Sequence, residues 1–323
     1  MIKRATRAFW RAGRKTPGFS IVGFLHGYVY GRWPYAYIGL ATGERKPPRL
    51  LRPFLRLLGR FLARSAGRGE EARRRAFADQ YHGKVVPTAA AEELVTLDRP
   101  IELRGIEQIV PYAAARDIVL QNPDHIVALE CPCRSVRENP CLPLDVCLVI
   151  GEPFAGFVAA HHPEKARWIS QSEAVEILRA ERNRGHVHHA FFKDAMLDRF
   201  YAICNCCSCC CGAMQAWRYG TPMLASSGYV STVDANRCVG CGVCADVCPF
   251  DAVRVTDRLA LVDSAACMGC GVCVAKCPHD ALALVRDPTR SEPLEVGRLV
   301  SSDTASRGGF GEQGVSERAD SLR

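Results

Sequence analysis

Eighteen of the 323 residues are cysteine, and eight of these occur in two copies of one pattern near the C-terminus. Each copy reads C-x2-C-x2-C-x3-C-P, beginning at Cys238 in the first and at Cys267 in the second. Thiolates at this spacing ligate iron–sulfur clusters, because a loop that curls around a cubane can bring three of them to three different irons. The pattern therefore predicts iron–sulfur ligation in this stretch.

The fourth ligand of each cluster must come from outside its own run of three cysteines. In two-cluster arrangements with this spacing, the last cysteine of each run ligates the cluster of the other run. The sequence thus predicts two [4Fe-4S] clusters, one on Cys238, Cys241, Cys244 and Cys277 and one on Cys267, Cys270, Cys273 and Cys248. Glycines between the cysteines suit this arrangement, because they permit positive φ and a close approach of the backbone.

The two copies are repeats of one unit, with 12 identities in 23 positions at an offset of 29 residues. Alternating apolar and polar residues predict a hairpin over 252–263 and outer strands over 229–234 and 281–286. This segment resembles a bacterial dicluster ferredoxin, which implies short hairpins and short helices around two clusters. The alternative is a pair of zinc sites built from C-x2-C pairs, but the third cysteine of each run and the C-P ending disfavour it.

Ten further cysteines lie upstream of this repeat, in two groups. They are Cys131, Cys133, Cys141 and Cys147 in the first, and Cys204, Cys206, Cys207, Cys209, Cys210 and Cys211 in the second. Six cysteines in eight residues do not suit an apolar core, and adjacent cysteines cannot form a disulfide without strain. All ten are therefore predicted to bind metal, with redox-active thiols as the alternative.

The identity of that metal stays open at the level of sequence. The first group can form one tetrahedral thiolate zinc site, or the two groups together can hold one or two additional iron–sulfur clusters. Cys210-Cys211-Gly212 resembles part of the motif of heterodisulfide-reductase-type proteins, but the long spacings of that family are absent, so the resemblance does not imply its cluster. The whole chain resembles larger ferredoxin-domain proteins with an added cysteine-rich domain.

The net charge of +8 is unevenly distributed. Residues 1–75 hold 18 lysines and arginines against three glutamates, a balance of +15, which leaves −7 for the remainder. Many cysteines without a clean signal peptide indicate a reducing compartment, where cysteine serves metal or redox chemistry. We therefore expect a cytoplasmic protein, either free or peripheral on the inner face of the membrane.

The basic region is predicted to be helical. Residues 1–16 form a basic helix, and the apolar, glycine-rich stretch 19–40 is too often interrupted to span a bilayer, which favours a packed element over a membrane contact. Arginines three and four residues apart predict an amphipathic helix over 49–68. Its basic stripe is either a solvated face or a surface for anionic lipid or for a redox partner protein, and nucleic acid ranks last.

The middle of the chain must position the upstream cysteines. The sequence predicts a polar connector with a helix over 69–100, a helix over 108–121 and a buried strand over 125–130 that leads to Cys131. Ser170 and Glu173 form a capping box that opens a helix, and Gly185 closes it. Beyond residue 287, low apolar content predicts a disordered tail.

These elements predict an α+β fold in four parts. They are a basic helical region (1–75), a cysteine-rich domain with a candidate metal site (76–225), a dicluster domain (226–287, hereafter the repeat domain) and the tail (288–323). No nucleotide-binding G-x-G-x-x-G motif in a strand-to-helix context is present, so neither NAD nor flavin is expected.

Three functions fit the sequence. The first is an electron-transfer protein that relays single electrons through two [4Fe-4S] clusters as a module of a larger redox system; no residue is assigned as an acid–base catalyst. The second is an oxidoreductase subunit whose upstream cysteine centre acts on a disulfide or another substrate. The third is a structural or sensing role, with zinc at the upstream cysteines.

Overall fold

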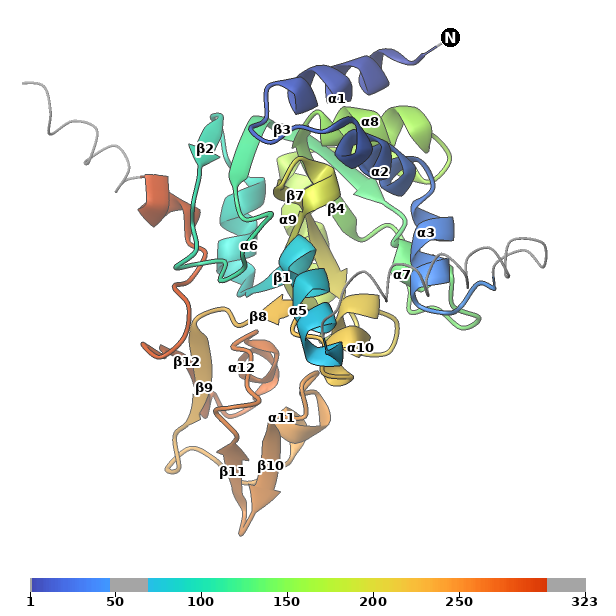
Figure 1. Cartoon of the computed structure of the whole chain (residues 1–323). Coiled ribbons are helices and arrows are strands. Elements are labelled where there is room, and N and C mark those ends of the chain that lie inside the picture. Colours follow the sequence, from blue (N-terminus) through green and yellow to red (C-terminus); the bar gives the residue numbers. More distant parts are fainter. Residues whose placement is uncertain (1, 47–68, 301–323) are drawn as a thin grey trace, which may run out of the picture.

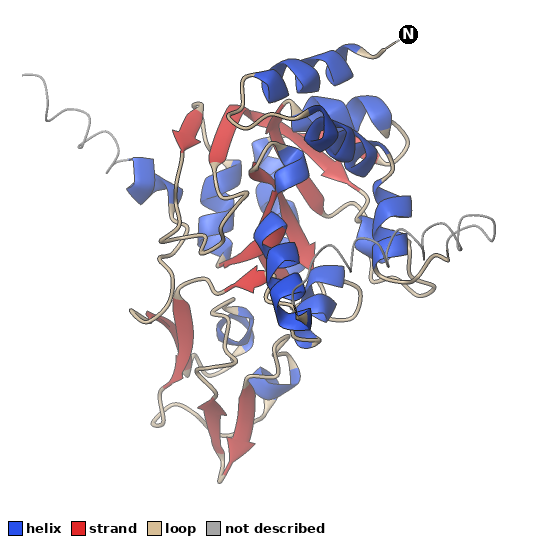
Figure 2. Ribbon diagram, viewed as in Figure 1, coloured by secondary structure: helices blue, strands red, loops and turns tan. Residues whose placement is uncertain are grey.

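The computed structural model describes residues 2–46 and 69–300. Its centre is an eight-stranded sheet of order β2-β3-β4-β7-β6-β1-β8, with β5 paired to β3 (Figures 1 and 2). The strands are β1 (Tyr81–Val86), β2 (Ile101–Leu103), β3 (Ile118–Leu129), β4 (Cys147–Glu152), β5 (Ala166–Ile169), β6 (Val187–Lys193), β7 (Arg199–Cys206) and β8 (Leu224–Ala225). Strands β1 and β8 are parallel and β1 and β6 antiparallel, so the sheet is mixed. The predicted α+β class is confirmed.

Helices cover both faces of this sheet, and each face has its own core. Helices α6 (Thr88–Val95) and α9 (Gln171–Asn183) pack on one face through residues such as Leu178. Helices α1 (Arg4–Arg14), α2 (Ile21–Arg32), α3 (Pro34–Ala41) and α8 (Phe154–His161) cover the other. Because side chains alternate along a strand, Val149 and Ile150 of β4 enter different cores. Six of the upstream cysteines lie in or against the core on the α8 side: Cys131, Cys133, Cys147, Cys204, Cys206 and Cys211.

The N-terminal helices pack on the protein, which agrees with the packed element expected over 19–40. A Cβ at Gly27 of α2 would lie 2.0 Å from the carbonyl oxygen of Ala195 in the short 3-10 helix η1 (Asp194–Met196), so only glycine permits this approach. Within residues 2–46 and 69–300, no helix is long and apolar enough to cross a membrane. The arginine helix predicted over 49–68 falls outside the described residues.

Two predictions for the middle region were wrong. The segment 69–100 is helical in part, as predicted, but it is not a polar connector, because α5 (Glu70–Gln80) leads into β1, a buried strand near the sheet edge. Lys84 of β1 is buried and donates hydrogen bonds to Ser291 Oγ and to the carbonyl oxygen of Glu292. The helix predicted over 108–121 is absent, since β3 starts at Ile118 and continues past a bulge at 121–126 to Leu129.

The helix that begins at Ser170 is confirmed. The Ser170 hydroxyl accepts a hydrogen bond from the backbone N–H of Glu173, and Gly185 takes φ 83° just after the end of α9. The tail prediction needs correction over 288–300. Leu294 and Val296 are buried in the core on the α9 side, so this stretch is a packed strap; residues 301–323 lie outside the described part.

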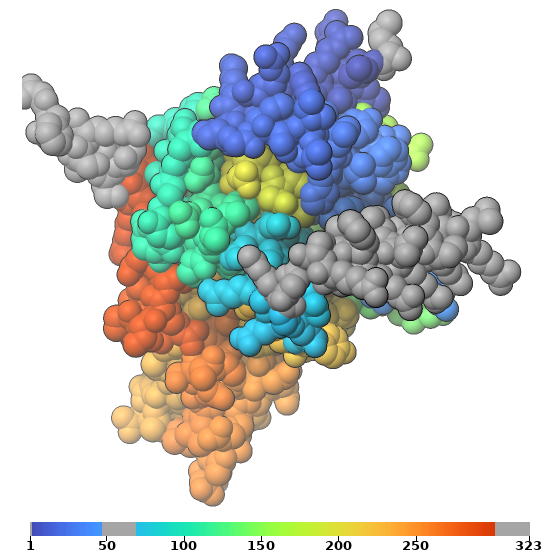
Figure 3. All heavy atoms as spheres, in the orientation of Figure 1, coloured from blue at the N-terminus to red at the C-terminus, as the bar shows by residue number. Residues whose placement is uncertain are grey.

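The repeat domain forms one end of the molecule and tapers to the turn between β10 and β11 (Figures 1 and 3). Its strands are β9 (Tyr229–Val233), β10 (Val253–Thr256), β11 (Leu259–Val262) and β12 (Leu282–Arg286), and its helices are α11 (Val243–Asp246) and α12 (Val272–Lys276). Strands β10 and β11 form the predicted hairpin, and the outer strands β9 and β12 pair antiparallel.

Candidate metal centres

The repeat domain contains two cavities of equal size, each with an empty volume of about 310 Å³. Cavity I is lined by Cys238, Cys241, Cys244 and Cys277, together with Ala260 and Leu282. Cavity II is lined by Cys248, Cys267, Cys270 and Cys273, together with Ser231 and Phe250. In each cavity, three cysteines of one run thus meet the last cysteine of the other run. The arrangement supports the predicted ligand sets, which remain predictions.

Repeat-related backbone amides point at the cysteine sulfurs. The amides of Ala252 and Ala281 donate to Cys248 Sγ and Cys277 Sγ, each at 3.3 Å. Those of Ser231 and Ala260 donate to Cys267 Sγ and Cys238 Sγ, each at 3.5 Å. Hydrogen bonds to sulfur stabilise the charge of a ligating thiolate and tune the potential of a cluster. The cavities therefore fit two iron–sulfur clusters.

Glycines let the backbone fold around each cavity. Gly240 and Gly269 adopt φ of 69° and 65°, and a Cβ at Gly269 would lie 2.2 Å from the carbonyl oxygen of Tyr229. No other residue fits such a position without moving the outer strand.

Residues 231–278 match the family model described as a 4Fe-4S dicluster domain. The repeat domain is a 4Fe-4S dicluster domain. It lies within a larger protein and implies two [4Fe-4S] clusters and an iron–sulfur electron-transfer function. No curated protein gives a significant match to the chain.

The structure separates the ten upstream cysteines into two sets that cut across their order in the sequence. A compact four-cysteine group combines one cysteine from the first group in the sequence with three from the second: Cys141, Cys207, Cys209 and Cys210. Their sulfur atoms all lie within 4.8 Å of one another, and the Sγ atoms of Cys141 and Cys209 are 3.1 Å apart. This group can hold a metal ion. Its position is near the surface, since Cys209 is exposed.

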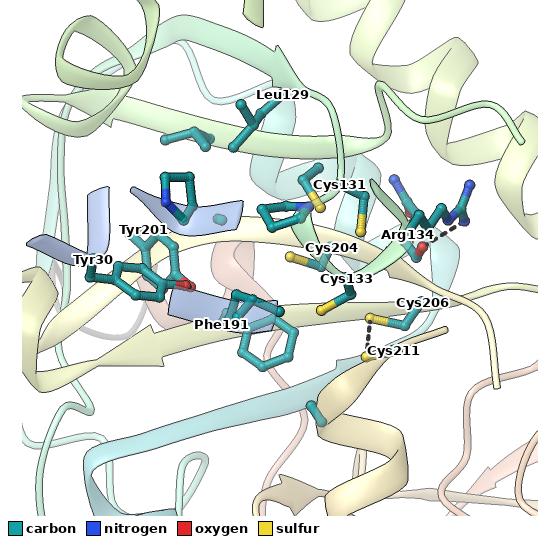
Figure 4. A pocket seen from close by; sticks show the side chains of 18 of the residues that line it. Tyr30, Leu129, Cys131, Cys133, Arg134, Phe191, Tyr201, Cys204, Cys206 and Cys211 are labelled. Atoms are coloured by element: carbon teal, nitrogen blue, oxygen red, sulfur yellow. Dashed lines mark hydrogen bonds between the residues drawn. The ribbon is translucent and has the colours of Figure 1, made fainter. Parts of the chain in front are cut away.

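The other six cysteines line a deep pocket on the α8 side of the sheet (Figure 4). This six-cysteine pocket consists of Cys131, Cys133, Cys147, Cys204, Cys206 and Cys211, and Cys207 of the four-cysteine group also lines it. Strand pairing places Cys147 directly opposite Cys204, and Cys206 lies two residues further along β7 on the same face. Cys133 enters from α7 (Pro132–Ser135) and Cys211 from the start of α10 (Gly212–Arg218).

The tetrahedral zinc site considered for Cys131, Cys133, Cys141 and Cys147 does not form as a unit. Cys131 lies within hydrogen-bond reach of Cys133 and Cys147, whereas Cys141 lies against Cys209 in the four-cysteine group. Sequence spacing did not reveal this partition, because the partition depends on how β4 pairs with β7.

Cys209 differs in acidity from other thiols of both sets, since burial raises the pKa of Cys141 to about 11 and also raises the pKa of Cys207 within its own group. The hydrogen bond with Cys133 and burial raise the pKa of Cys131 to about 12. Burial alone would raise the pKa of Cys209, but hydrogen bonds with Cys141 and Cys210 lower it below its ordinary value. Metal binding must therefore displace protons from the buried pocket, whereas the four-cysteine group already favours one thiolate.

A buried ion pair, which sequence reasoning did not single out, lies between the two sets. The Arg134 guanidinium is 1% exposed and donates to Glu181 Oε2 at 2.6 Å and to the carbonyl oxygen of Asn205 at 2.9 Å. Its charge acts on both Cys131 of the pocket and Cys207 of the group. The only sequence signal was its position directly after Cys133. Arg134 can offset the negative charge of thiolates on either side.

The six-cysteine pocket continues into an apolar chamber (Figure 4). Tyr30, Phe191 and Tyr201 line the end away from the sulfurs, and the hydroxyl groups of Tyr30 and Tyr201 are 2.7 Å apart. Pocket and chamber together span about 830 Å³, including space open to solvent, against about 310 Å³ for each dicluster cavity. The pocket thus has empty space beyond its cysteines.

Helix α10 connects this pocket to the dicluster domain. Cys211 precedes its first residue, and Trp217 near its end packs edge-on against Phe250, with ring centroids 5.3 Å apart. Phe250 lines cavity II, whereas its counterpart in the second repeat, His279, is exposed at cavity I. Cavity II therefore faces the cysteine-rich domain.

Proposed function

We propose that this protein relays single electrons between a redox partner protein and the six-cysteine pocket, as a module of a larger redox system. When bound, the two [4Fe-4S] clusters supply sites that accept and release one electron each. The chain supplies the order of these sites. Cavity I includes Cys241, which is exposed, and is the contact point for the partner. Cavity II has Cys267 and Cys273 buried and faces inward.

The contact between Trp217 and Phe250 carries this proposal. Trp217 lies six positions after Cys211, which corresponds to about 9 Å along the helix axis. Buried Phe250, Met268 and Cys267 belong to the same core as Met214, Cys206 and Cys211. Packed protein thus fills the space between cavity II and the pocket. Packed protein is a better medium for electron transfer than the water that a hinged linker would admit.

We expect Trp217→Ala to slow electron transfer from the dicluster domain to the upstream cysteines on the order of tenfold, the equivalent of about 1.4 kcal/mol in an activation barrier. The measurement is rapid mixing of the oxidised protein with dithionite, followed by freeze-quench EPR of each centre. Tyr219→Ala is the matched control, because this aromatic side chain lies on the same turn but is exposed to solvent. Equal rates in both variants, or no reducible centre upstream, would overturn the proposal.

The apolar chamber favours a second candidate function, an oxidoreductase subunit that acts on a small substrate beside the six cysteines. A disulfide substrate would accept two electrons and two protons and leave as two thiols, with electrons supplied through the dicluster domain. Ala202 lines this chamber. Its replacement by phenylalanine is expected to fill the space and to reduce viologen-driven disulfide turnover roughly tenfold or more.

The control for this test is Ala113→Phe, a substitution at an exposed alanine of the same domain. Iron content and the EPR signals of the dicluster domain should be unchanged in both variants. A protein that turns over no disulfide, or an Ala202→Phe variant with full activity, would exclude this second function.

A further inference from the structure

The geometry of the four-cysteine group suits one metal ion. Four thiolates about 2.3 Å from a central ion lie about 3.8 Å from one another in a tetrahedron. The sulfur atoms of this group already lie within 4.8 Å of one another. Only a small contraction would close them around an ion, which leaves no space for several irons and sulfides.

The six-cysteine pocket has a different geometry. Its sulfurs form an open chain of neighbours, in which Cys131 contacts Cys133 and Cys147, and Cys211 contacts Cys133 and Cys206. Within the described part of the chain, these six do not form a compact single-ion group like that of Cys209. Sulfurs that line the wall of a cavity instead of converging on one point suit a polynuclear centre.

The lining of the pocket restricts the chemistry of what it binds. Among the described residues, no aspartate, glutamate or histidine lines it. Burial raises the pKa values of the lining phenols of Tyr30, Tyr81 and Tyr201, which keeps them protonated, so the cysteine sulfurs are its main potential ligand atoms for metal. Soft thiolate sites favour zinc, copper(I) and iron–sulfur clusters over metals that prefer oxygen. The pocket encloses more space than either dicluster cavity, which are themselves sites for clusters.

Backbone amides in this pocket serve the sulfurs as they do in the dicluster domain. Amides of Arg134, Gly212 and Met214 hydrogen-bond to Cys131, Cys133 and Cys211, respectively. The Arg134 guanidinium adds a buried positive charge beside Cys131. Amide donors and a cation stabilise the negative charge that several thiolates and sulfides bring into a buried site.

We propose that the six-cysteine pocket holds an iron–sulfur cluster of its own, separate from a single metal ion in the four-cysteine group. This inference names the electron acceptor of the proposed function and rests on it in that respect. Its test measures composition, whereas the Trp217 experiment measures a rate. If the pocket contains iron and sulfide but is reduced as fast in Trp217→Ala as in the control variant, the electron route through Trp217 is contradicted and the cluster in the pocket is not.

The experiment uses the full-length protein purified without oxygen and without chemical reconstitution. Acid-labile sulfide, iron and zinc are counted per chain and iron is classified by Mössbauer spectroscopy. The dicluster domain accounts for about eight irons and eight sulfides. We expect wild-type protein to exceed eight sulfides clearly, and Cys133→Ala/Cys211→Ala to return to about eight. A wild-type count of eight sulfides would overturn the proposal, whether or not any variant folds.

The matched control is Cys141→Ala/Cys209→Ala in the four-cysteine group. It should lose about one metal ion and no sulfide, because a single ion needs no sulfide. If this control loses the additional sulfide and the pocket variant keeps it, the four-cysteine group holds the cluster and the assignment to the pocket fails. Should Cys133→Ala/Cys211→Ala not fold, Cys204→Ser offers a milder change at a strand position whose backbone pairing remains, and unaltered sulfide in it would also count against the proposal.

Discussion

Replacing Cys277 together with Cys241 is expected to remove one cluster and to leave the other intact, although the two cysteines belong to different repeats. Both line cavity I, so their loss leaves that cavity with two thiolates while cavity II keeps all four. Iron should fall by about four per chain, and the reduced protein should show the EPR signal of one isolated dicluster-domain cluster.

The contrasting variant is Cys270→Ala/Cys277→Ala. These two cysteines belong to the same repeat, but they line different cavities, so both clusters lose a ligand. We expect damage to both, with a loss of the magnetic interaction between them and iron below that of the first variant. If each repeat instead ligated its own cluster, the two variants would exchange their phenotypes. Iron content and EPR of samples purified without oxygen decide between these outcomes.

The dicluster domain could be predicted from sequence because its information is local. Three predicted ligands of each cluster lie within seven residues, and each run ends at a fixed interval with the cysteine predicted to ligate the other cluster. The positive φ of Gly240 and Gly269, the hairpin and the outer strands also depend on short-range patterns. Each of these features appears in the structure where the repeat placed it.

The partition of the upstream cysteines could not be predicted, because it depends on long-range pairing. Cys147 meets Cys204 only through the register of β4 against β7, and Cys141 meets Cys209 across 68 positions of chain. Spacing within each group of cysteines in the sequence encodes neither contact. A site formed by paired strands can be predicted only once the strand pairing is known.

The wrong predictions for single elements have a related cause. Residues 108–121 carry apolar residues at helical intervals, but Ile118 and Val119 belong to a long strand with a bulge that Asn122 accommodates at φ 51°. Strand β1 contains His82, Gly83 and Lys84, which read as polar connector. Lys84 is buried only because the strap beyond residue 288 provides oxygen acceptors, which pattern reasoning in β1 alone cannot detect.

Replacing Glu181 with glutamine is expected to lower the free energy of unfolding by about 3–5 kcal/mol, because it leaves the Arg134 charge buried without its anion. Glu181 is fully buried and also accepts hydrogen bonds from Arg184 and His186. Burial would raise the pKa of Glu181, but the hydrogen bonds from His186 and Arg134 lower it overall, so the carboxylate is ionised at neutral pH. The measurement is urea denaturation without oxygen, followed by circular dichroism.

The control for this prediction is Glu92→Gln. Glu92 of α6 pairs with Arg179, which lies on α9 as Glu181 does. Because Arg179 is largely exposed, the cost should remain within about 1 kcal/mol. The double variant Arg134→Met/Glu181→Leu removes both charges and should cost less than the sum of the two single variants, since neither charge is left alone. Additive costs would show that the two side chains stabilise the protein independently.

The same variants separate the structural role of Arg134 from an electrostatic one. Its charge lies beside both Cys131 and Cys207, so a metal centre at either position is stabilised in its more reduced, more negative form. Arg134→Met/Glu181→Leu leaves the net charge of the protein unchanged. It nevertheless removes the positive charge of Arg134, which is the member of the ion pair nearer to the sulfurs. We therefore expect the upstream centre to become harder to reduce in the double variant while the dicluster potentials stay constant. An unchanged upstream potential would restrict Arg134 to holding β7 and α9 together.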